Sequence, residues 1–251
     1  MCTDCGCGPS DHQHHHHHSP AEQNQGRIVR IEEDLLAKNN RLAAANRRLF
    51  REKGLLVFNL VSSPGSGKTT LLERTLSDLQ HELHFAVLEG DQQTSNDADR
   101  IAATGVPAVQ INTGSGCHLD AHMVGHGVEK FAALPLDILM IENVGNLVCP
   151  ASFDLGEDAK IALLSVTEGE DKPLKYPDMF KAADVLLLTK IDLLPYLRFD
   201  IEQCKTFARQ VNPHVRIFEL SCQNGSGLAQ WYDWLRQEMA TKRCVARDDL
   251  R

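Results

Sequence analysis

Lys68 and Thr69 follow a glycine-rich turn, and proteins use this combination of residues to hold the phosphates of a nucleotide. The turn lies between an apolar run at residues 55–61, expected to be a buried strand, and a helical pattern that opens at Lys68. It fits G-x-x-x-x-G-K-[ST], except that Ser62 replaces the first glycine. Backbone N–H groups, the helix dipole and the Lys68 ammonium would all attract an anion. The expected phosphate contacts are Gly65, Ser66, Gly67, Lys68, Thr69 and Thr70.

Two acidic residues could complete a magnesium site with the Thr69 hydroxyl. Asp91 comes just after a predicted strand at residues 84–89, and Glu142 comes just after another at residues 136–141. In phosphate-loop proteins Mg²⁺ is bound by the Ser or Thr after the loop lysine and by nearby acidic groups. Asp91 could instead be an acidic residue of a surface turn. The predicted catalytic and magnesium-binding residues are Lys68, Thr69, Asp91 and Glu142.

A second element, Thr189-Lys190-Ile191-Asp192, is similar to the N-K-x-D sequence that reads guanine, with Thr189 in place of Asn. The Asp192 carboxylate can accept from both N1–H and the 2-amino group of guanine, a donor pair that adenine lacks. An unpaired buried acceptor costs about 1–3 kcal/mol, so ATP should be rejected. Lys190 is expected along the base, and Ser221 and Cys222, at the end of the last predicted strand, at a further base contact. The predicted nucleotide is GTP or GDP.

The N-terminus carries a cluster of metal-ligand residues. Cys2, Cys5 and Cys7 put three thiols within a few residues, and His12 and residues 14–18 add imidazoles. Thiolates and imidazoles suit nickel, zinc or copper, and a flexible segment can fold around such an ion. The histidines could also be a purification tag, and the cysteines could be surface thiols of a disordered tail. Spacing alone does not name the metal.

A second set of possible metal ligands lies in the middle of the chain. Cys117, His118 and His122 are close in sequence, with the two histidines expected on one face of a helix, and Cys149 follows later. Together they offer up to four nickel or zinc ligands. Cys117 lies in the sequence between the segments of Asp91 and Glu142, and Cys149 lies seven residues beyond Glu142, so a nucleotide-dependent movement of either segment would change the distance between ligands. The alternative is buried cysteine with solvated histidines. His126 is expected to lack companion ligands and to be structural or exposed.

Strands and helices alternate along the rest of the chain, which predicts an α/β fold: a three-layer α/β/α phosphate-loop NTPase with a mostly parallel sheet. We expect a flexible metal-binding segment at residues 1–20, an amphipathic helix at 21–54 that packs on the domain, and a nucleotide-binding domain at 55–251. The remaining expected strands are residues 107–111, 161–166, 185–188 and 216–220, and the remaining expected helices are residues 97–104, 119–131, 200–210 and 228–239.

Composition excludes several classes of protein. The 251 residues are 42% hydrophobic, enough for one sizeable core, and contain no run of 18 apolar residues that would cross a membrane. A net charge of −8 argues against nucleic-acid binding. The N-terminus lacks an apolar signal-peptide core, so we expect a cytoplasmic protein, in which eight cysteines are thiols or metal ligands rather than disulfides.

These motifs together resemble HypB, the family of nickel-incorporating GTPases of [NiFe]-hydrogenase maturation. The resemblance rests on C-x2-C-x-C, the histidine run, SSPGSGKTT, EGDQQT, GCHLDAHM, ENVGNLVCP, LLLTKIDLLPY and SCQNGSGL, and it extends over essentially the whole chain. It implies a dimeric GTPase of the signal-recognition-like class. It also implies nickel at Cys2, Cys5 and Cys7, and nickel or zinc at a dimer-interface site from Cys117, His118 and Cys149, joined by His122 in some relatives.

The resemblance implies partners as well: a HypA-type zinc protein, a prolyl-isomerase metallochaperone in some bacteria, and the hydrogenase large subunit. The function predicted from the sequence is GTP hydrolysis, assisted by Mg²⁺, that drives nickel delivery. Two alternatives stay open, a urease-type nickel GTPase and a metal-storage protein whose nucleotide fold has little turnover.

Overall fold

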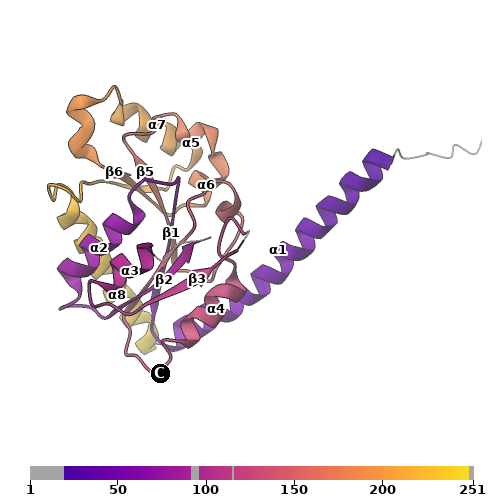
Figure 1. Cartoon of the computed structure of the whole chain (residues 1–251), viewed down its shortest axis with the longest axis horizontal. Helices are drawn as coiled ribbons and strands as arrows, with labels where there is room; N and C mark the ends of the chain where they lie inside the picture. Colours follow the sequence, from indigo (N-terminus) through magenta and orange to yellow (C-terminus); the bar gives the residue numbers. More distant parts are fainter. Residues whose placement is uncertain (1–19, 92–95, 115, 249–251) are drawn as a thin grey trace, which may run out of the picture. The chain divides into compact units, whose positions relative to one another are not determined.

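A seven-stranded sheet, all of whose strands are parallel, forms the centre of the molecule (Figure 1). The computed structural model describes residues 20–91, 96–114 and 116–248. The strand order is β3-β2-β4-β1-β5-β6-β7. The strands are β1 (Leu56–Ser62), β2 (Phe85–Asp91), β3 (Ala108–Asn112), β4 (Ile138–Glu142), β5 (Ala159–Ser165), β6 (Val185–Thr189) and β7 (Arg216–Glu219). The predicted parallel α/β fold is confirmed.

Helices cover both faces of the sheet (Figure 1). Side chains of α2, α3 and α8 pack with one face of the strands in a single apolar cluster. The end of α1, α4, α6 and α7 pack against the opposite face. The α-helices are α1 (Pro20–Glu52), α2 (Lys68–Leu79), α3 (Asn96–Ala102), α4 (Ala121–Glu129), α5 (Lys172–Lys175), α6 (Pro177–Ala182), α7 (Ile201–Val211) and α8 (Leu228–Asp248), and the 3-10 helices are η1 (Cys149–Ala151) and η2 (Ile191–Tyr196).

The chain divides after Leu35 into two compact units, so the boundary falls within α1 rather than after it. In the larger unit, Asn39 Oδ1 accepts from the Ala121 N–H, and the Asn46 amide donates to the Leu155 carbonyl. The last part of α1 therefore packs on the domain, as the sequence predicted. The helix ends before Gly54, whose positive φ of 62° suits a residue without a side chain.

Several expected element boundaries are wrong in ways that matter for the sites. Asp91 and Glu142 are the last residues of β2 and β4, not the residues after them. Helix α4 begins at Ala121, where the Asp120 side chain accepts from the Met123 N–H, so His118 lies before the helix rather than on it. Helices α5 and α6 were not predicted, because each is too short to show a helical repeat.

None of the helices among the described residues combines the length and the apolar composition needed to cross a membrane.

Candidate nucleotide and metal sites

The glycine-rich turn connects β1 to the first residue of α2, as the sequence predicted. Gly67 precedes the helix with φ at 98°, a conformation that a side chain would strain, and it has no side chain to cap the helix. The first N–H groups of α2 are therefore available to an anion. Lys68 is 9% exposed, and its Nζ donates to Ser62 Oγ at 3.0 Å. Ser62, which departs from the consensus glycine, thus holds the loop lysine in place.

Thr69 and two glutamates form a compact acidic group beside this lysine. The Thr69 hydroxyl donates to Glu142 Oε1 at 2.7 Å, and Glu142 is paired in register with Glu89 on the neighbouring strand β2. Both glutamates are only 3% exposed. Within the described part of the chain, the Oε2 atom of each is buried and has no hydrogen-bond partner. Buried carboxylate oxygens without donors call for a cation.

Burial changes the protonation of these carboxyl groups. It raises the pKa of Glu142 to about 7, although Lys68 and the Thr69 hydroxyl oppose the increase. It raises the pKa of Glu89 to about 8, and the neighbouring charge of Glu142 adds to the effect. Burial also lowers the pKa of Lys68. A divalent cation would relieve the desolvation of both carboxylates, so this group of residues fits a hard ion such as Mg²⁺.

A cavity of about 460 Å³ opens over this group. Asp91, at the end of β2, lines it together with the phosphate loop, as the sequence predicted. Asp97 and Arg100 of α3 also line it, and Arg100 is held by ion pairs to Glu73 and Asp97. Sequence reasoning missed Glu89, Asp97 and Arg100.

A second cavity, of about 400 Å³, adjoins the first and shares Gly67, Thr70 and Lys190 with it. The guanine-reading residue predicted from the sequence, Asp192, lies here. The cavity is lined by Ser66, Gly67, Thr70, Thr189, Lys190, Asp192, Leu193, Cys222 and Gln223. Adjoining phosphate and base cavities form a site for a whole nucleotide.

The residues around Asp192 hold the site together. Ser221 Oγ donates to Asp192 Oδ1 at 2.5 Å, so Ser221 orients this carboxylate. The Thr189 hydroxyl donates to the Ser66 carbonyl at 2.7 Å and Lys190 Nζ to the Gly65 carbonyl at 2.7 Å. Thr189, where the related sequence has Asn, therefore joins the base loop to the phosphate loop. The Cys222 thiol lines the cavity, and burial raises its pKa to about 11.

The loop after β5 also contacts the phosphate loop, which the sequence did not indicate. Ser66 Oγ donates to Glu168 Oε1 at 2.7 Å, and Lys172 Nζ lies 3.3 Å from Glu168 Oε2. Glu168 also accepts from the Ser165 N–H at 3.1 Å. The loops after β5 and β6 thus both contact the phosphate loop and hold it in place.

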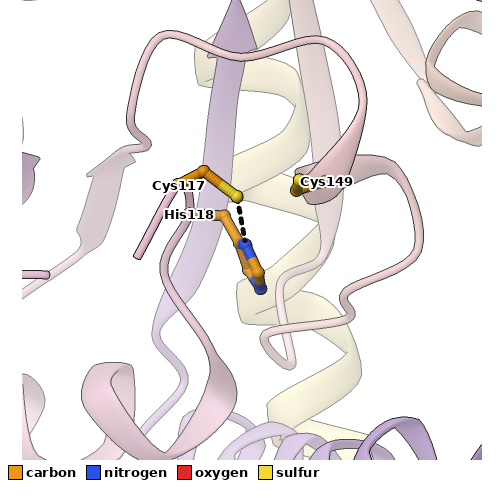
Figure 2. Close-up of side chains that lie close together, drawn as sticks. All are labelled: Cys117, His118 and Cys149. Carbon is orange, nitrogen blue, oxygen red and sulfur yellow. Dashed lines mark hydrogen bonds between the residues drawn. The ribbon is translucent and has the colours of Figure 1, made fainter. Parts of the chain in front are cut away.

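Three of the four predicted central metal ligands come together (Figure 2). Ligand atoms of Cys117, His118 and Cys149 all lie within 4.8 Å of one another, and Cys117 Sγ is 3.4 Å from His118 Nδ1. Figure 2 shows Cys149 facing the other two from a separate segment, which η1 begins. The hydrogen bond shared with Cys149, together with burial, raises the pKa of Cys117, and burial lowers the pKa of His118. Two soft thiols and a neutral imidazole form a nickel- or zinc-type ligand set.

His122 is not part of that group in the described structure. It lies on α4, and its Nε2 is 3.1 Å from Nε2 of His126. The expectation that His118 and His122 share a helix face is wrong, because α4 starts after His118. The expectation that His126 has no companion side chain is also wrong.

A buried asparagine connects the acidic group to the metal ligands. Asn143, next to Glu142, accepts from the Leu119 N–H at 3.0 Å and from the Val144 N–H at 3.0 Å, and its amide donates to Asn59 Oδ1 at 3.2 Å. Leu119 follows Cys117 and His118 directly. Asn143, the residue after Glu142, therefore connects the segment that carries Cys117 and His118 to the acidic group.

A buried lysine supports the other ligand segment. Lys160 Nζ donates to the carbonyls of Pro150, Ala151 and Phe153 at 2.9, 3.3 and 3.1 Å, which fixes the turn that starts at Cys149. Burial lowers the pKa of Lys160, while Glu157, 3.8 Å away, opposes this. Phe153 also packs its ring on His118, with centroids 4.0 Å apart. The sequence did not predict the roles of Lys160 and Phe153, because no sequence pattern indicates which backbone carbonyls a buried lysine will bond.

The N-terminal ligand candidates Cys2, Cys5, Cys7, His12 and the histidines at 14–18 lie outside the described residues.

The parallel sheet, the glycine-rich turn and the adjoining base cavity define a nucleotide-binding protein of the phosphate-loop class. Residues 56–219 match the CobW/HypB/UreG nucleotide-binding domain. The chain is 59% identical over 228 residues to hydrogenase maturation factor HypB of Azotobacter vinelandii, covering 91% of this chain and 75% of that protein. It is 43% identical over 214 residues to the hydrogenase/urease maturation factor HypB of Helicobacter pylori (strain ATCC 700392 / 26695), covering 84% and 88% respectively.

A solved structure of a relative supports the same family assignment. The crystal structure of HypB from Helicobacter pylori in complex with nickel has a TM-score of 0.77 and 42% sequence identity, covering 81% of this chain and 96% of that one. The chain belongs to the HypB family of hydrogenase maturation factors.

Proposed function

We propose that this protein hydrolyses GTP and uses the reaction to control delivery of nickel to the large subunit of a [NiFe]-hydrogenase. The observation that carries the proposal is the adjacency of two sites: Glu142 bonds the phosphate-loop Thr69, and the next residue, Asn143, bonds the segment that bears Cys117 and His118. Membership of a family of hydrogenase maturation factors and the nickel complex of the Helicobacter pylori relative support the choice of metal and pathway.

GTP is the proposed substrate, because Asp192 lies in the base cavity with Ser221 holding its carboxylate. Lys68 and the N–H groups at the start of α2 bind the phosphates and stabilise charge that develops as water attacks the terminal phosphate. Lys190, whose stem lies against Gly67, holds the base loop on the phosphate loop.

The acidic group holds the assisting cation. Thr69, Glu142 and Asp91 are the proposed Mg²⁺ ligands, and Glu89, buried beside Glu142, is a further one. Bound Mg²⁺ would neutralise charge on the phosphate oxygens. Such a cation would favour the ionised form of Glu142 and Glu89, because its charge would offset the burial that raises their pKa values.

Nickel is the proposed cargo. Cys117, His118 and Cys149 offer three ligands, so a fourth must come from outside the cluster. A second copy of the chain is the proposed source, which makes the metal site part of a homodimer interface. Zinc fits the same ligands, and Cys2, Cys5 and Cys7 remain the proposed additional nickel site.

Loss of the terminal phosphate is the proposed trigger for release. The segment after β4 is the one proposed to respond to the phosphate, and it carries both Asn143 and Cys149. Gly145 lies close enough to the phosphate loop that an added Cβ would be 3.0 Å from Pro64 Cα, so this segment packs directly against the loop. The proposed receivers are a HypA-type accessory protein, a prolyl-isomerase metallochaperone and the hydrogenase large subunit, all in the cytoplasm.

The test is a metal titration of the full chain with and without a non-hydrolysable GTP analogue, on the parent and the Cys117→Ala variant. In the parent, the analogue should change apparent nickel affinity at the central site by about fivefold or more, a coupling of roughly 1 kcal/mol. Cys117→Ala should remove this site from the stoichiometry while GTP still binds. Cys244→Ala, at an exposed thiol of α8, is the matched control. Equal metal stoichiometry in Cys117→Ala and parent would exclude the proposal.

A second candidate is nickel delivery to a urease, which the hydrogenase/urease name of one relative favours. Restoring the gene in a deletion strain separates the two, since only the activated enzyme regains nickel-dependent activity. A storage protein would instead show no measurable GTP turnover.

A further inference from the structure

Both segments that carry the central metal ligands are bonded to the same helix, α1. The first ligand segment, residues 117–121, carries Cys117 and His118 and leads into α4. The second ligand segment, residues 149–155, begins with Cys149 in η1. Because the two segments are separate in sequence, the distance between their ligands depends on what holds the segments together.

Asn39 of α1 bonds to each of the two segments. Its Oδ1 accepts from the Ala121 N–H at 2.9 Å, and its Nδ2 donates to the Asp154 carbonyl at 2.7 Å. The side chain is only 4% exposed. An amide group has an acceptor end and a donor end, so it can join an N–H of one segment to a carbonyl of the other.

Asn46 makes the same kind of connection further along the helix. Its Nδ2 donates to the Ala121 carbonyl at 2.8 Å and to the Leu155 carbonyl at 3.0 Å. Asn39 and Asn46 lie about two turns apart and therefore on one face of α1, which also buries Ala43. A buried polar side chain is costly unless it is hydrogen-bonded, and here the compensating bonds reach the two ligand segments.

The chain that follows the second ligand segment packs directly on α1. An added Cβ on Gly156 would lie 2.7 Å from the Ala43 carbonyl oxygen and 2.8 Å from Asn46 Cβ. Arg47 adds an ion pair to Asp154, with Nη2 2.7 Å from Oδ1. Movement of the second ligand segment away from α1 would break these contacts.

The bonds from α1 fall close to the ligands themselves. Ala121 is the third residue after His118. Asp154 directly follows Phe153, whose ring packs on the His118 ring with centroids 4.0 Å apart. A shift of Asp154 would therefore move a side chain that contacts a metal ligand. Changing a residue that holds metal ligands in place from outside the ligand set typically lowers metal affinity by about 10–100-fold.

We propose that Asn39 and Asn46 are positioning residues of the central metal site. By bonding both ligand segments to one helix, they fix the distance between the two thiols and so allow Cys149 to reach the ion that Cys117 and His118 hold. Neither asparagine is itself a ligand. The inference deepens the proposed function, because it rests on metal binding by this cluster, but it does not depend on GTP hydrolysis.

The test measures thiolate coordination in the full chain with Co²⁺ as the probe, because a cobalt–thiolate charge-transfer band grows with the number of bound thiolates. The substitutions Cys2→Ser, Cys5→Ser and Cys7→Ser are made in every sample, so that the band reports the central site.

In Asn39→Ala and in Asn46→Ala, the dissociation constant for Co²⁺ should rise at least about tenfold. The band per bound ion should weaken as well, because Cys149 no longer reaches the ion. Each single substitution leaves the other asparagine in place, and circular dichroism and binding of a GTP analogue establish that the domain is folded.

Two variants are matched controls. Asn40→Ala changes an exposed asparagine of the same helix. Asn212→Ala removes an amide that donates to the Phe180 and Ala183 carbonyls, at another place in the domain. Both should keep the dissociation constant and the band of the parent. A role in stability alone would lower the melting temperature of Asn46→Ala without changing its band.

A dissociation constant that rises less than about tenfold, or a band of the parent's intensity, in Asn39→Ala and Asn46→Ala would overturn the proposal. Cys117→Ala in the same background separates this result from failure of the proposed function. If the parent shows no band that Cys117→Ala removes, the cluster does not bind metal, and the proposed metal site and this inference are both wrong.

Discussion

The acidic group at the strand ends and the cysteine cluster in the loops are built in opposite ways. Thr69, Glu89 and Glu142 are buried and sit on regular elements, and the strand register aligns the two glutamates. Cys117 and Cys149 are half-buried, Cys117 in a loop and Cys149 at the start of η1, and their ligand atoms lie close to each other and to His118. The first site is preformed by strand pairing, whereas the second takes three ligands from two separate segments.

This difference suits two different tasks. A preformed, buried carboxylate site binds a hard cation with its nucleotide in one geometry. An open thiol cluster on loops can lose its ion when a loop moves. The two sites share the end of β4 and the segment that follows it. Glu142 ends β4 and belongs to the first site, Cys149 belongs to the second, and Asn143 connects them.

The largest expected effect tests the preformed site. Lys68→Ala should reduce GTP hydrolysis by at least about 10²-fold, because a buried positive charge aimed at the phosphates is lost. Nickel content at the cysteine residues should stay that of the parent. Phosphate release and elemental analysis measure the two quantities, with Lys181→Ala at an exposed position of α6 as the control. Normal hydrolysis by Lys68→Ala would mean that the phosphate loop is wrongly assigned.

The second largest expected effect tests recognition of the guanine base by Asp192. Asp192→Asn should weaken GTP binding by about 10–100-fold, since charge-assisted hydrogen bonds contribute roughly 1.5–3 kcal/mol. Binding of the xanthine nucleotide should improve in the same variant, because the new amide can donate to the carbonyl that replaces the 2-amino group. Equilibrium binding of both nucleotides measures this. If GTP affinity does not change, Asp192 does not read the base.

The pH dependence of stability tests the buried carboxyl pair. Glu89 and Glu142 have pKa values raised to about 8 and about 7, so the folded chain keeps protons that the unfolded chain has lost. Their contribution to stability is complete below about pH 4.5 and is lost as the pH rises to about 8, by at most about 1.4 kcal/mol per pH unit for each group. Urea unfolding of the nucleotide-free protein should therefore show a free energy that falls over this range.

Glu89→Gln should flatten this slope, whereas Glu52→Gln, at an exposed residue of α1, should not. The metal affinity of the cysteine cluster should have the opposite pH dependence to the unfolding free energy. It should fall as the pH is lowered, because the thiols and the imidazole become protonated. A pH-independent unfolding free energy would show that the two glutamates are not buried together in solution.

The smallest expected effect tests the connection between the regions. Asn143→Ala leaves the Leu119 N–H without its acceptor and should reduce the nucleotide effect on metal affinity from about fivefold to about twofold or less. Asn212→Ala is the matched control, because it removes an asparagine whose amide donates to backbone carbonyls at the C-terminal end of α7. Coupling that survives Asn143→Ala unchanged would rule out this route.

Motifs and periodicity were sufficient for the fold class and the phosphate loop. The parallel sheet, the loop from Ser62 to Thr70 and the placement of Asp192 all follow from local patterns, because each depends on residues close in sequence. Cys117, His118 and Cys149 could be named for the same reason, since their types alone mark them as ligands.

The sequence by itself therefore determined the local chemistry, that is, which residues could bind phosphate, base or metal. Only the tertiary structure decided which of these residues are neighbours in space. Glu89 became part of the acidic group because β2 and β4 are neighbours in the sheet, which no local pattern encodes. His122 faced His126 rather than the cysteines because α4 begins at Ala121, which sets the direction of both side chains.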